Sequence, residues 1–380
     1  MGYKICFLST VDPMNQSSWS GITYHMFRTL SLDHEVKWAG PVLFPKWAGY
    51  LYSAWSRWNR LMKRRVTSHN YLNAFFSAMA LRKRFRDDDF DMIVIGAGEP
   101  ELFAFLRTRL PVIYIADTTF ALMVDYYPWH SGLCMPAIRQ GNGIEQRAIK
   151  KAFHLIYSSD WAAASAKSVY GAGPGKITIA PFGASLTEVP SWDMIRNKGV
   201  SDKCHLLFLG SDWIRKGGPI AYEAYKLLKG SGLAVDFTIV GCRPELPPGH
   251  DVMVYPWLDK NNPVEVRKLY NIFLSSDIVI SPSRADCTPV AFSEAAAFGI
   301  PVFTTDTGGI SSIVKNWKNG FCLPYDTSPE TFSERIREVW LSGKEFMELK
   351  LSSRQEYETR LNWEQWSEQF NIAVSMAGKK

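Results

Sequence analysis

The sequence predicts an α/β protein with two consecutive Rossmann-like domains that face each other across a cleft. Short apolar runs rich in β-branched and aromatic residues alternate with longer amphipathic runs along almost the whole chain. This alternation is typical of parallel sheets that are covered by helices on both faces. The series restarts after a weakly patterned stretch, 182–203, and 380 residues suit two domains of ordinary size.

The individual elements follow from the same pattern. Strands are expected at 4–8, 35–39, 92–95, 112–115, 155–157, 205–209, 235–240, 278–280 and 302–304. The helices expected between them include 23–32, 145–151, 220–228, 264–274 and 289–297. We expect an N-terminal domain over 1–185 and a C-terminal domain over 186–361. A last helix in 362–380, which contains Trp363 and Trp366, is expected to pack back on the first domain.

Composition and charge narrow the class of protein. The formal net charge is +6, and the first 180 residues hold 21 Lys and Arg against 13 Asp and Glu. No nucleic-acid motif accompanies this modest excess, so nucleic acid is not an expected partner. The six cysteines are scattered without metal-ligand spacing, as in a reducing cytosol. No signal peptide or membrane-spanning run is visible, so we expect a cytoplasmic protein.

The turns that follow strands are the expected ligand sites, because helix N-termini there point free N–H groups outward. Gly21, at the start of the first helix, allows a substrate close to the backbone. The alternative is that Ser20 only caps this helix. After the strand at 205–209 the chain reads Gly210-Ser211-Asp-Trp-Ile-Arg215-Lys216-Gly-Gly. Cations beside glycines suit a diphosphate, although a solvated loop lysine would look the same.

The strongest segment is 281–301, which follows the strand at 278–280. A helix is expected to begin near Thr288 and Pro289, so that the N–H groups up to Val290 can hold phosphate oxygens. Asp286 and Glu294, eight positions apart, can bind the sugar and ribose hydroxyls of one ligand. The alternative is that Asp286 caps the helix and Glu294 pairs with a lysine. Arg284 adds a further cation to this turn.

These residues together resemble the GT-B glycosyltransferases of family four, the glycosyl transferases group 1. The resemblance covers roughly residues 4–370. The matching positions, in the family's order, are Gly21, His25, 34–36, 145–158, 181–183, Gly210, Lys216, Gly217, Val240, Gly241, Asp286, Glu294, Gly299, Pro301, Gly308, Gly309, Asn319 and Gly320.

The resemblance implies a retaining, metal-independent hexosyltransferase without a cofactor, whose C-terminal domain binds a UDP- or GDP-sugar and whose N-terminal domain faces a hydroxyl acceptor. It assigns catalysis to Lys216 and Asp286, with Asp117 nearest to the place of a family histidine. The donor-binding positions that it implies are Gly21, Gly210, Ser211, Arg215, Lys216, Arg284, Asp286, Thr288, Pro289, Val290 and Glu294. Two of them depart from the family, because Asp286 replaces a glutamate and Ser211 replaces an arginine.

The segment 50–86 is amphipathic, aromatic and basic. Such a segment can lie on an anionic membrane surface beside a lipid-linked acceptor or a cell-surface glycan precursor, which places the protein peripherally on the inner face of the membrane. The alternative is a solvated helix that packs on its own domain. Two other functions share the fold: a nucleotide-sugar epimerase, and a nucleotide-sugar-binding protein without catalysis.

Overall fold

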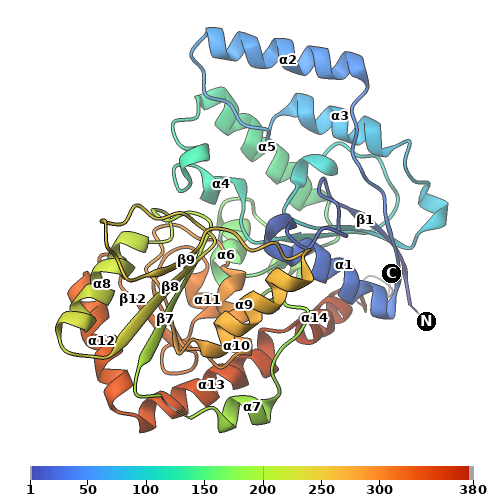
Figure 1. Cartoon of the computed structure of the whole chain (residues 1–380). Coiled ribbons are helices and arrows are strands. Elements are labelled where there is room, and N and C mark those ends of the chain that lie inside the picture. The colour runs from blue at the N-terminus through green and yellow to red at the C-terminus, as the bar shows by residue number, and fades with distance from the viewer. Residues whose placement is uncertain (1, 200, 376–380) are drawn as a thin grey trace. The chain divides into compact units, whose positions relative to one another are not determined.

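The computed structural model describes residues 2–199 and 201–375, which form two compact units (Figure 1). One unit runs to Ala180 and takes in the chain from Ser367 onward, and the other is Pro181–Trp366. The predicted domain limits at 185/186 and 361/362 stay predictions. Residues 1, 200 and 376–380 of those predicted ranges lie outside the described residues.

The first unit is built on a parallel six-stranded sheet in the order β2-β1-β3-β4-β5-β6. Its strands are β1 (Lys4–Leu8), β2 (Glu35–Trp38), β3 (Met92–Ile95), β4 (Val112–Ala116), β5 (His154–Tyr157) and β6 (Ile177–Ile179). Its α-helices are α1 (Ile22–Asp33), α2 (Lys46–Leu61), α3 (Tyr71–Leu81), α4 (Phe120–Met123), α5 (Met135–Lys151) and α6 (Asp160–Ser168). Short 3-10 turns lie at η1 (Ser18–Gly21), η2 (Asp87–Asp89), η3 (Pro100–Leu102), η4 (Pro128–His130) and η5 (Pro174–Lys176).

The second unit holds another parallel six-stranded sheet, in the order β12-β11-β10-β7-β8-β9. Its strands are β7 (Cys204–Leu209), β8 (Val235–Val240), β9 (Met253–Tyr255), β10 (Ile278–Ser281), β11 (Val302–Thr305) and β12 (Gly320–Leu323). Its helices are α7 (Trp192–Asn197), α8 (Gly218–Gly230), α9 (Pro263–Ser275), α10 (Val290–Ala297), α11 (Ile310–Ile313), α12 (Pro329–Leu341) and α13 (Lys344–Arg360). The predicted α/β class with parallel sheets is therefore confirmed.

The strands β3, β4, β5, β10 and β11 are buried along their whole length, whereas the edge strand β2 alternates exposed and half-buried residues. A strand with helices on both faces has no solvent side, which is why these strands read as continuous apolar runs. The strands missing from the sequence prediction, β6, β9 and β12, are three or four residues long and lie at sheet edges. Their apolar runs are too short to stand out from the flanking turns.

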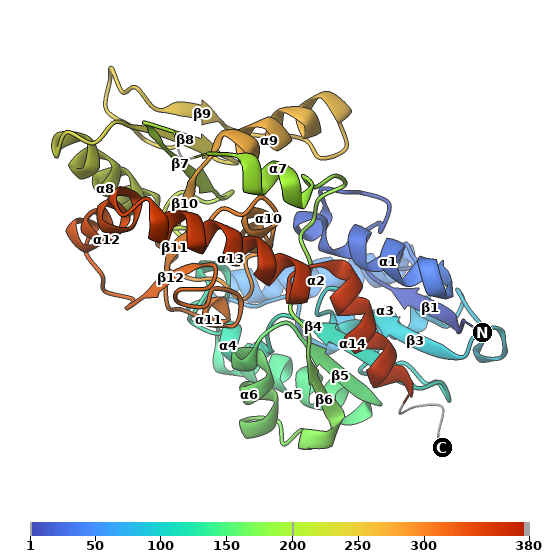
Figure 2. The ribbon, with the colours of Figure 1, turned by 90° about the horizontal axis from the view of Figure 1, so that it is seen from below.

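The C-terminal helix α14 (Trp363–Ser375) follows α13 and passes from the second unit to the first (Figure 2). Trp363 stacks on Phe182, and its Nε1 donates to the carbonyl of Ala184 at 2.9 Å. Farther along, Asn371 Oδ1 lies 3.1 Å from His34 Nε2. The aromatic residues at 363 and 366 belong to the second unit, and the later residues Phe370 and Asn371 contact His34, which directly follows α1. No helix in the described part of the chain is long and apolar enough to cross a membrane.

The turns after β7 and β10 touch each other through a glycine. Gly217 has φ +74°, and a Cβ built there would lie 1.9 Å from the carbonyl oxygen of Pro282. The amide of Arg284 also donates to the carbonyl of Arg215 at 2.7 Å. Only glycine combines this left-handed backbone with such a close approach of another backbone.

We therefore expect Gly217→Ala to lower the free energy of unfolding by about 2 kcal/mol or more, through left-handed strain and overlap with the backbone of Pro282. Urea unfolding monitored by tryptophan fluorescence measures this change. Gly230→Ala at the end of α8 is the matched control, because a Cβ there meets nothing within 4 Å. Equal stability of the two variants would contradict the close approach.

Candidate functional site

The order of the second sheet reverses between β10 and β7. Open parallel sheets bind ligands beyond the carboxyl ends of their strands at such a point. Three turns converge there, because a Cβ on Gly241 after β8 would lie 3.0 Å from the carbonyl oxygen of Gly210 after β7, and Gly217 touches the turn after β10. The predicted diphosphate turn, which begins with Gly210 and Ser211, therefore lies at the switch point.

Lys216 and Asp286 form a buried ion pair at this switch point. The Lys216 ammonium contacts the Asp286 carboxylate, and both residues are buried. Arg215 Nη1 lies 3.5 Å from the same carboxylate oxygen and donates to the carbonyl of Ala285 at 2.7 Å. The structure thus brings the predicted anion Asp286 together with the predicted cations Arg215 and Lys216, which precede it in the chain by 71 and 70 positions. Asp286 forms ion pairs with these cations, whereas the alternative interpretation was that it only caps the following helix.

The helices α8 and α10 begin beside this pair without a side-chain cap. Their N-cap residues, Gly217 and Pro289, make no side-chain hydrogen bond, whereas Asn262 and Ser328 cap α9 and α12. Pro289 was predicted inside the helix, but it is the N-cap, and α10 begins at Val290. The first N–H groups of a helix lack partners within the helix and attract anions. Thr288, which precedes the cap, is buried.

Glu294 lies in the buried interior of α10 and pairs with Lys260. The Lys260 Nζ lies 2.5 Å from Glu294 Oε1 and donates to the carbonyl of Ser185 at 3.1 Å. Burial raises the pKa of Glu294, and the positive charge of Lys260 opposes that rise. In this structure Glu294 therefore pairs with a lysine, which was the alternative interpretation of this residue.

Arg284 makes a different contact from Arg215. Its Nη1 donates to the carbonyl of Tyr325 at 2.6 Å, and its guanidinium lies 3.6 Å from the centre of the Tyr325 ring.

Gly21 and Asp117 belong to the first unit. Gly21 is the left-handed N-cap of α1 with φ +87°, so Ser20 is not the cap of that helix. Asp117 directly follows β4 at the carboxyl end of the first sheet.

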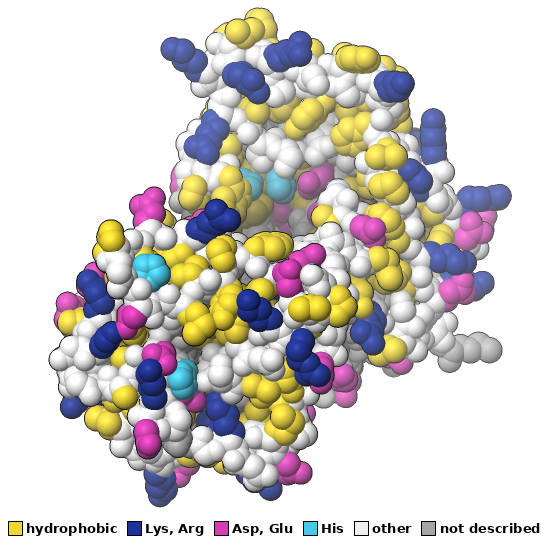
Figure 3. Space-filling view, in the orientation of Figure 1, with side chains coloured by type: hydrophobic (Ala, Val, Ile, Leu, Met, Phe, Trp, Pro, Cys, Tyr) yellow, Lys and Arg dark blue, Asp and Glu magenta, His cyan; other side chains and the backbone are white. Residues whose placement is uncertain are grey.

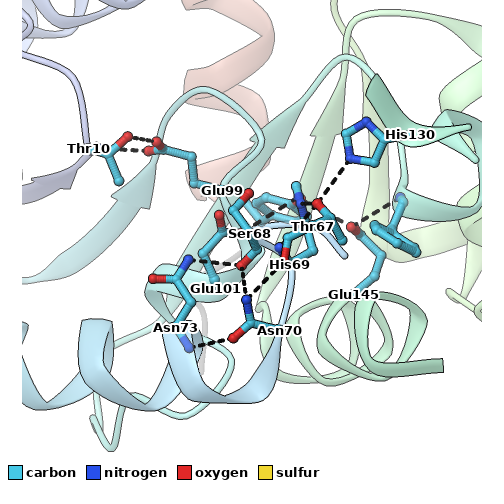
Figure 4. A network of polar contacts seen from close by, with 12 residues as sticks. Thr10, Thr67, Ser68, His69, Asn70, Asn73, Glu99, Glu101, His130 and Glu145 are labelled. Carbon is cyan, nitrogen blue, oxygen red and sulfur yellow. Dashed lines mark hydrogen bonds and ion pairs between the residues drawn. The ribbon is translucent and has the colours of Figure 1, made fainter. Parts of the chain in front are cut away.

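The first unit holds a polar cluster that the sequence analysis missed (Figure 4). His69 Nε2 lies 3.8 Å from Glu101 Oε2, and the Thr67 hydroxyl lies 3.4 Å from both His69 Nδ1 and His130 Nε2. Glu145 Oε1 accepts from the Tyr114 hydroxyl at 3.2 Å. The signal was present, because 96–101 reads Gly-Ala-Gly-Glu-Pro-Glu directly after a buried strand.

Burial governs the protonation of this cluster. It raises the pKa of Glu101 to about 7 and those of Glu99 and Glu145 to about 8. Burial also lowers the pKa of His69 and His130 to about 4, because a charged imidazole loses its hydration there. At neutral pH both histidines are therefore uncharged. Within residues 2–199 and 201–375, no group of three or more His, Cys, Asp or Glu side chains could hold a metal ion.

The raised pKa of Glu145 gives a testable pH dependence. Its ordinary pKa is 4.5 and its folded value is about 8, so the folded protein binds more protons than the unfolded chain between these values. The free energy of unfolding should then fall as pH rises from 6.5 to 8, by up to about 1.4 kcal/mol per pH unit from this group. We expect Glu145→Gln to flatten that slope in urea unfolding, and exposed Glu348→Gln to leave it unchanged. A slope that Glu145→Gln does not alter would refute the assignment.

Parts of this chain are similar to known glycosyltransferases. Residues 193–356 match the model of the family described as glycosyl transferases group 1. A curated relative, the D-inositol 3-phosphate glycosyltransferase of Paenarthrobacter aurescens (strain TC1), is 28% identical over 206 residues, which are 50% of this chain and 49% of the relative. The chain thus spans about half the length of the curated relatives that it matches.

Solved structures are similar over almost the whole chain. The sucrose-phosphate synthase of Thermosynechococcus elongatus is 14% identical with a TM-score of 0.71, and the alignment covers 99% of each chain. Anabaena HepE, in complex with UDP-glucose, is 15% identical with a TM-score of 0.65 and coverage of 98% of this chain and 100% of that one. The chain therefore has the GT-B fold, and residues 193–356 of its second unit are similar to the glycosyl transferases group 1 family.

Proposed function

We propose that this protein is a retaining, metal-independent glycosyltransferase that moves a sugar from a UDP- or GDP-sugar to a hydroxyl acceptor. The observation that carries the proposal is the buried Lys216–Asp286 pair at the switch point of the second sheet, beside the N-termini of α8 and α10. The group 1 match of the same unit and the UDP-glucose bound by the similar HepE structure support the choice of donor.

In the donor complex Lys216 and Arg215 would take the diphosphate oxygens, together with the N-terminal end of α10, which has no side-chain cap. A phosphate is a stronger partner for a buried ammonium than one carboxylate, because it offers more oxygens and more charge. Asp286 would then turn to a hydroxyl of the donor sugar. Its side chain is one methylene shorter than the family's glutamate, so the sugar would have to approach α10 closely.

The ribose is the proposed partner of Glu294, which lies deeper in α10. Lys260 holds this carboxylate in place, and its second contact, to the carbonyl of Ser185, fixes the lysine itself. A carboxylate with one cation on one oxygen keeps acceptor capacity for two neighbouring hydroxyls. Ser211 is exposed and carries no charge, so Arg215 is proposed to supply the charge that the family's arginine would bring.

The proposed reaction is a displacement on one face of the sugar. The acceptor oxygen forms a bond to the anomeric carbon on the face from which the diphosphate leaves, so the configuration is retained. The bond from that carbon to the phosphate oxygen breaks, and its electron pair stays on the diphosphate. The acceptor proton passes to the departing phosphate oxygen. Lys216 and the helix N-termini stabilise the charge that develops there, in place of a metal ion.

Lys216→Met should weaken nucleotide binding by roughly 10- to 100-fold, because one charge-assisted hydrogen bond contributes about 1.5–3 kcal/mol. A thermal-shift titration with UDP, GDP and their sugars measures this, since stabilisation follows affinity. Lys226→Met is the matched control, because Lys226 lies exposed on the same helix α8. Unchanged stabilisation of Lys216→Met would contradict the donor site.

Donor turnover by the wild-type protein separates a transferase from a nucleotide-sugar-binding protein, and the sugar product identifies an epimerase.

For the acceptor we propose a lipid-linked substrate that the protein meets at an anionic membrane surface. Residues 46–86 contain ten Lys and Arg and no Asp or Glu. Along α2 only Ala48 and Asn59 are buried, while Tyr50 is 76% and Leu61 78% exposed. Figure 3 shows basic and hydrophobic side chains together over α2. An exposed helix with both kinds of side chain is suited to the headgroup region of a bilayer, which would place the protein peripherally on the inner membrane face.

Neutralising part of this surface should reduce membrane binding. Each cation near an anionic surface contributes about 1 kcal/mol, so a fourfold Ser variant should lose most binding to phosphatidylserine vesicles in a low-salt flotation assay. The substituted residues are Arg60, Lys63, Arg64 and Arg65. The control removes four exposed cations of the second unit, namely Lys226, Lys318, Arg337 and Lys344. Equal vesicle binding by the two variants would rule out α2 and its connection as the membrane surface.

A further inference from the structure

Lys260 lies in the connection between β9 and α9 and joins two other segments of the second unit. Its Nζ lies 2.5 Å from Glu294 Oε1 on α10 and donates to the carbonyl of Ser185 at 3.1 Å. The lysine side chain is 21% exposed and that of Glu294 only 6%, so water and salt screen this ion pair weakly. An ammonium that binds two acceptors from different segments has a defined position, unlike a solvated surface lysine.

The carbonyl of Ser185 belongs to a segment that is itself held in place. The Ser293 hydroxyl on α10 donates to the carbonyl of Phe182 at 3.1 Å. Trp363 Nε1 donates to the carbonyl of Ala184 at 2.9 Å. Ser185 therefore offers a fixed acceptor, which sets where the ammonium lies relative to α10.

The backbone on either side of Lys260 is fixed by the N-terminal end of α9. Glu265 Oε2 accepts a hydrogen bond from the amide of Asp259 at 2.6 Å. Asn262 caps α9, because its side chain accepts from the amide of Val264 at 3.0 Å. The lysine is thus presented to α10 from an ordered loop, so little conformational entropy remains to be lost when a ligand binds beside it.

The charge of Glu294 depends on this contact. Burial raises the pKa of Glu294, because a carboxylate loses its hydration there, and the charge and hydrogen bond of Lys260 oppose that rise. Other charged side chains on the elements around α10 are engaged elsewhere. Their contacts are the pairs Arg267–Glu188, Arg354–Glu358 and Lys216–Asp286, the ring of Tyr255 for Lys268, and the carbonyl of Lys198 for Lys350.

We infer that Lys260 is a positioning residue, which keeps Glu294 an aligned anion for the ribose of the donor nucleotide. This inference rests on the proposed function, and it names the residue on which recognition of the nucleoside depends. A carboxylate accepts from two neighbouring hydroxyl groups, whereas a protonated carboxyl group has fewer acceptor sites and makes weaker, neutral hydrogen bonds.

The role of Lys260 has a consequence for pH. With Lys260 present, Glu294 stays ionised, so ribose recognition should not change with pH across the neutral range. Without Lys260, burial alone acts on the carboxyl group and its pKa rises further. A carboxyl group is ionised only above its pKa, so ribose recognition should then be lost as pH falls through that raised value.

The test compares each ribonucleotide with its 2′-deoxy form on the full chain. The probes are UDP with 2′-deoxyUDP and GDP with 2′-deoxyGDP, titrated by calorimetry between about pH 6 and about pH 9. Both members of a pair carry the same diphosphate, so the ratio of their dissociation constants cancels the titration of the phosphate. In the wild-type protein we expect one ribonucleotide to bind about tenfold or more tightly than its 2′-deoxy form, by the same ratio at every pH.

Lys260→Met should reduce this ratio by about fivefold or more at the acid end of the range, because a neutral hydrogen bond is weaker than a charge-assisted one. Lys260→Arg keeps a cation and should restore a ratio that does not change with pH. Lys229→Met is the matched control, because Lys229 forms an exposed ion pair with Asp251 in the same unit. The double variant Lys260→Met/Glu294→Gln, which buries no unpaired charge, should give a low ratio at every pH.

The protonation of Glu294 can also be read without a nucleotide. The ¹³C chemical shift of its carboxyl group, assigned with Glu294→Gln, should be that of a carboxylate at every pH in the wild-type protein and should titrate in Lys260→Met. A wild-type ratio near one, a wild-type ratio that varies with pH, or a Lys260→Met protein that matches the wild type would each overturn the inference. Absence of binding by all four nucleotides would instead contradict the proposed function, and the chemical shift would still test Lys260.

Discussion

The ion pair between Lys216 and Asp286 is the interaction on which the second unit's ligand site depends. Two charges leave water when this pair is buried, and their attraction offsets that loss only where geometry and further hydrogen bonds are good. The geometry comes from two turns 70 residues apart, which approach closely because Gly217 has no side chain. A pair of apolar residues would fill the same space without the desolvation cost. Keeping charges here is therefore easier to explain by ligand binding than by stability.

The N-termini of the helices around the pair also differ from those of the other helices in how they are capped. A side-chain cap stabilises a helix by about 1 kcal/mol, and several helices of this protein have one, such as α3, α6, α9 and α12. The helices α1, α8 and α10 begin instead at Gly21, Gly217 and Pro289, which make no side-chain cap. These helices follow the strands at the switch points of the two sheets. The amides that open α1 and α8 donate instead to the backbone carbonyls of Trp19 and Trp213, so these two helices are closed by their own turns, while Pro289 leaves α10 without a side-chain cap at the switch point.

Both sheets are parallel and six-stranded with one switch point each, but they differ in strand order and in the charge of their carboxyl edges. Cations and an anion are combined at the edge of the second sheet, whereas the edge of the first presents carboxyl groups. Under the proposed function, the edge of the second sheet receives the diphosphate and the first unit faces the acceptor hydroxyl. The fold supplies the positions, and the side chains after each strand decide the chemistry.

The sequence by itself determined the α/β class, the parallel sheets and most buried strands, because hydrophobic periodicity is a local signal. It also placed Gly210, Lys216 and Asp286 in turns after strands, where ligands bind in open parallel sheets. The sequence could not predict which residues far apart in the chain come into contact. That Lys216 meets Asp286, that Glu294 meets Lys260 and that Arg284 lies on Tyr325 depend on how turns pack in space. The cluster of Glu101, His69 and His130 was likewise decided only by the tertiary structure, because burial, which sets its protonation, is a property of the folded chain.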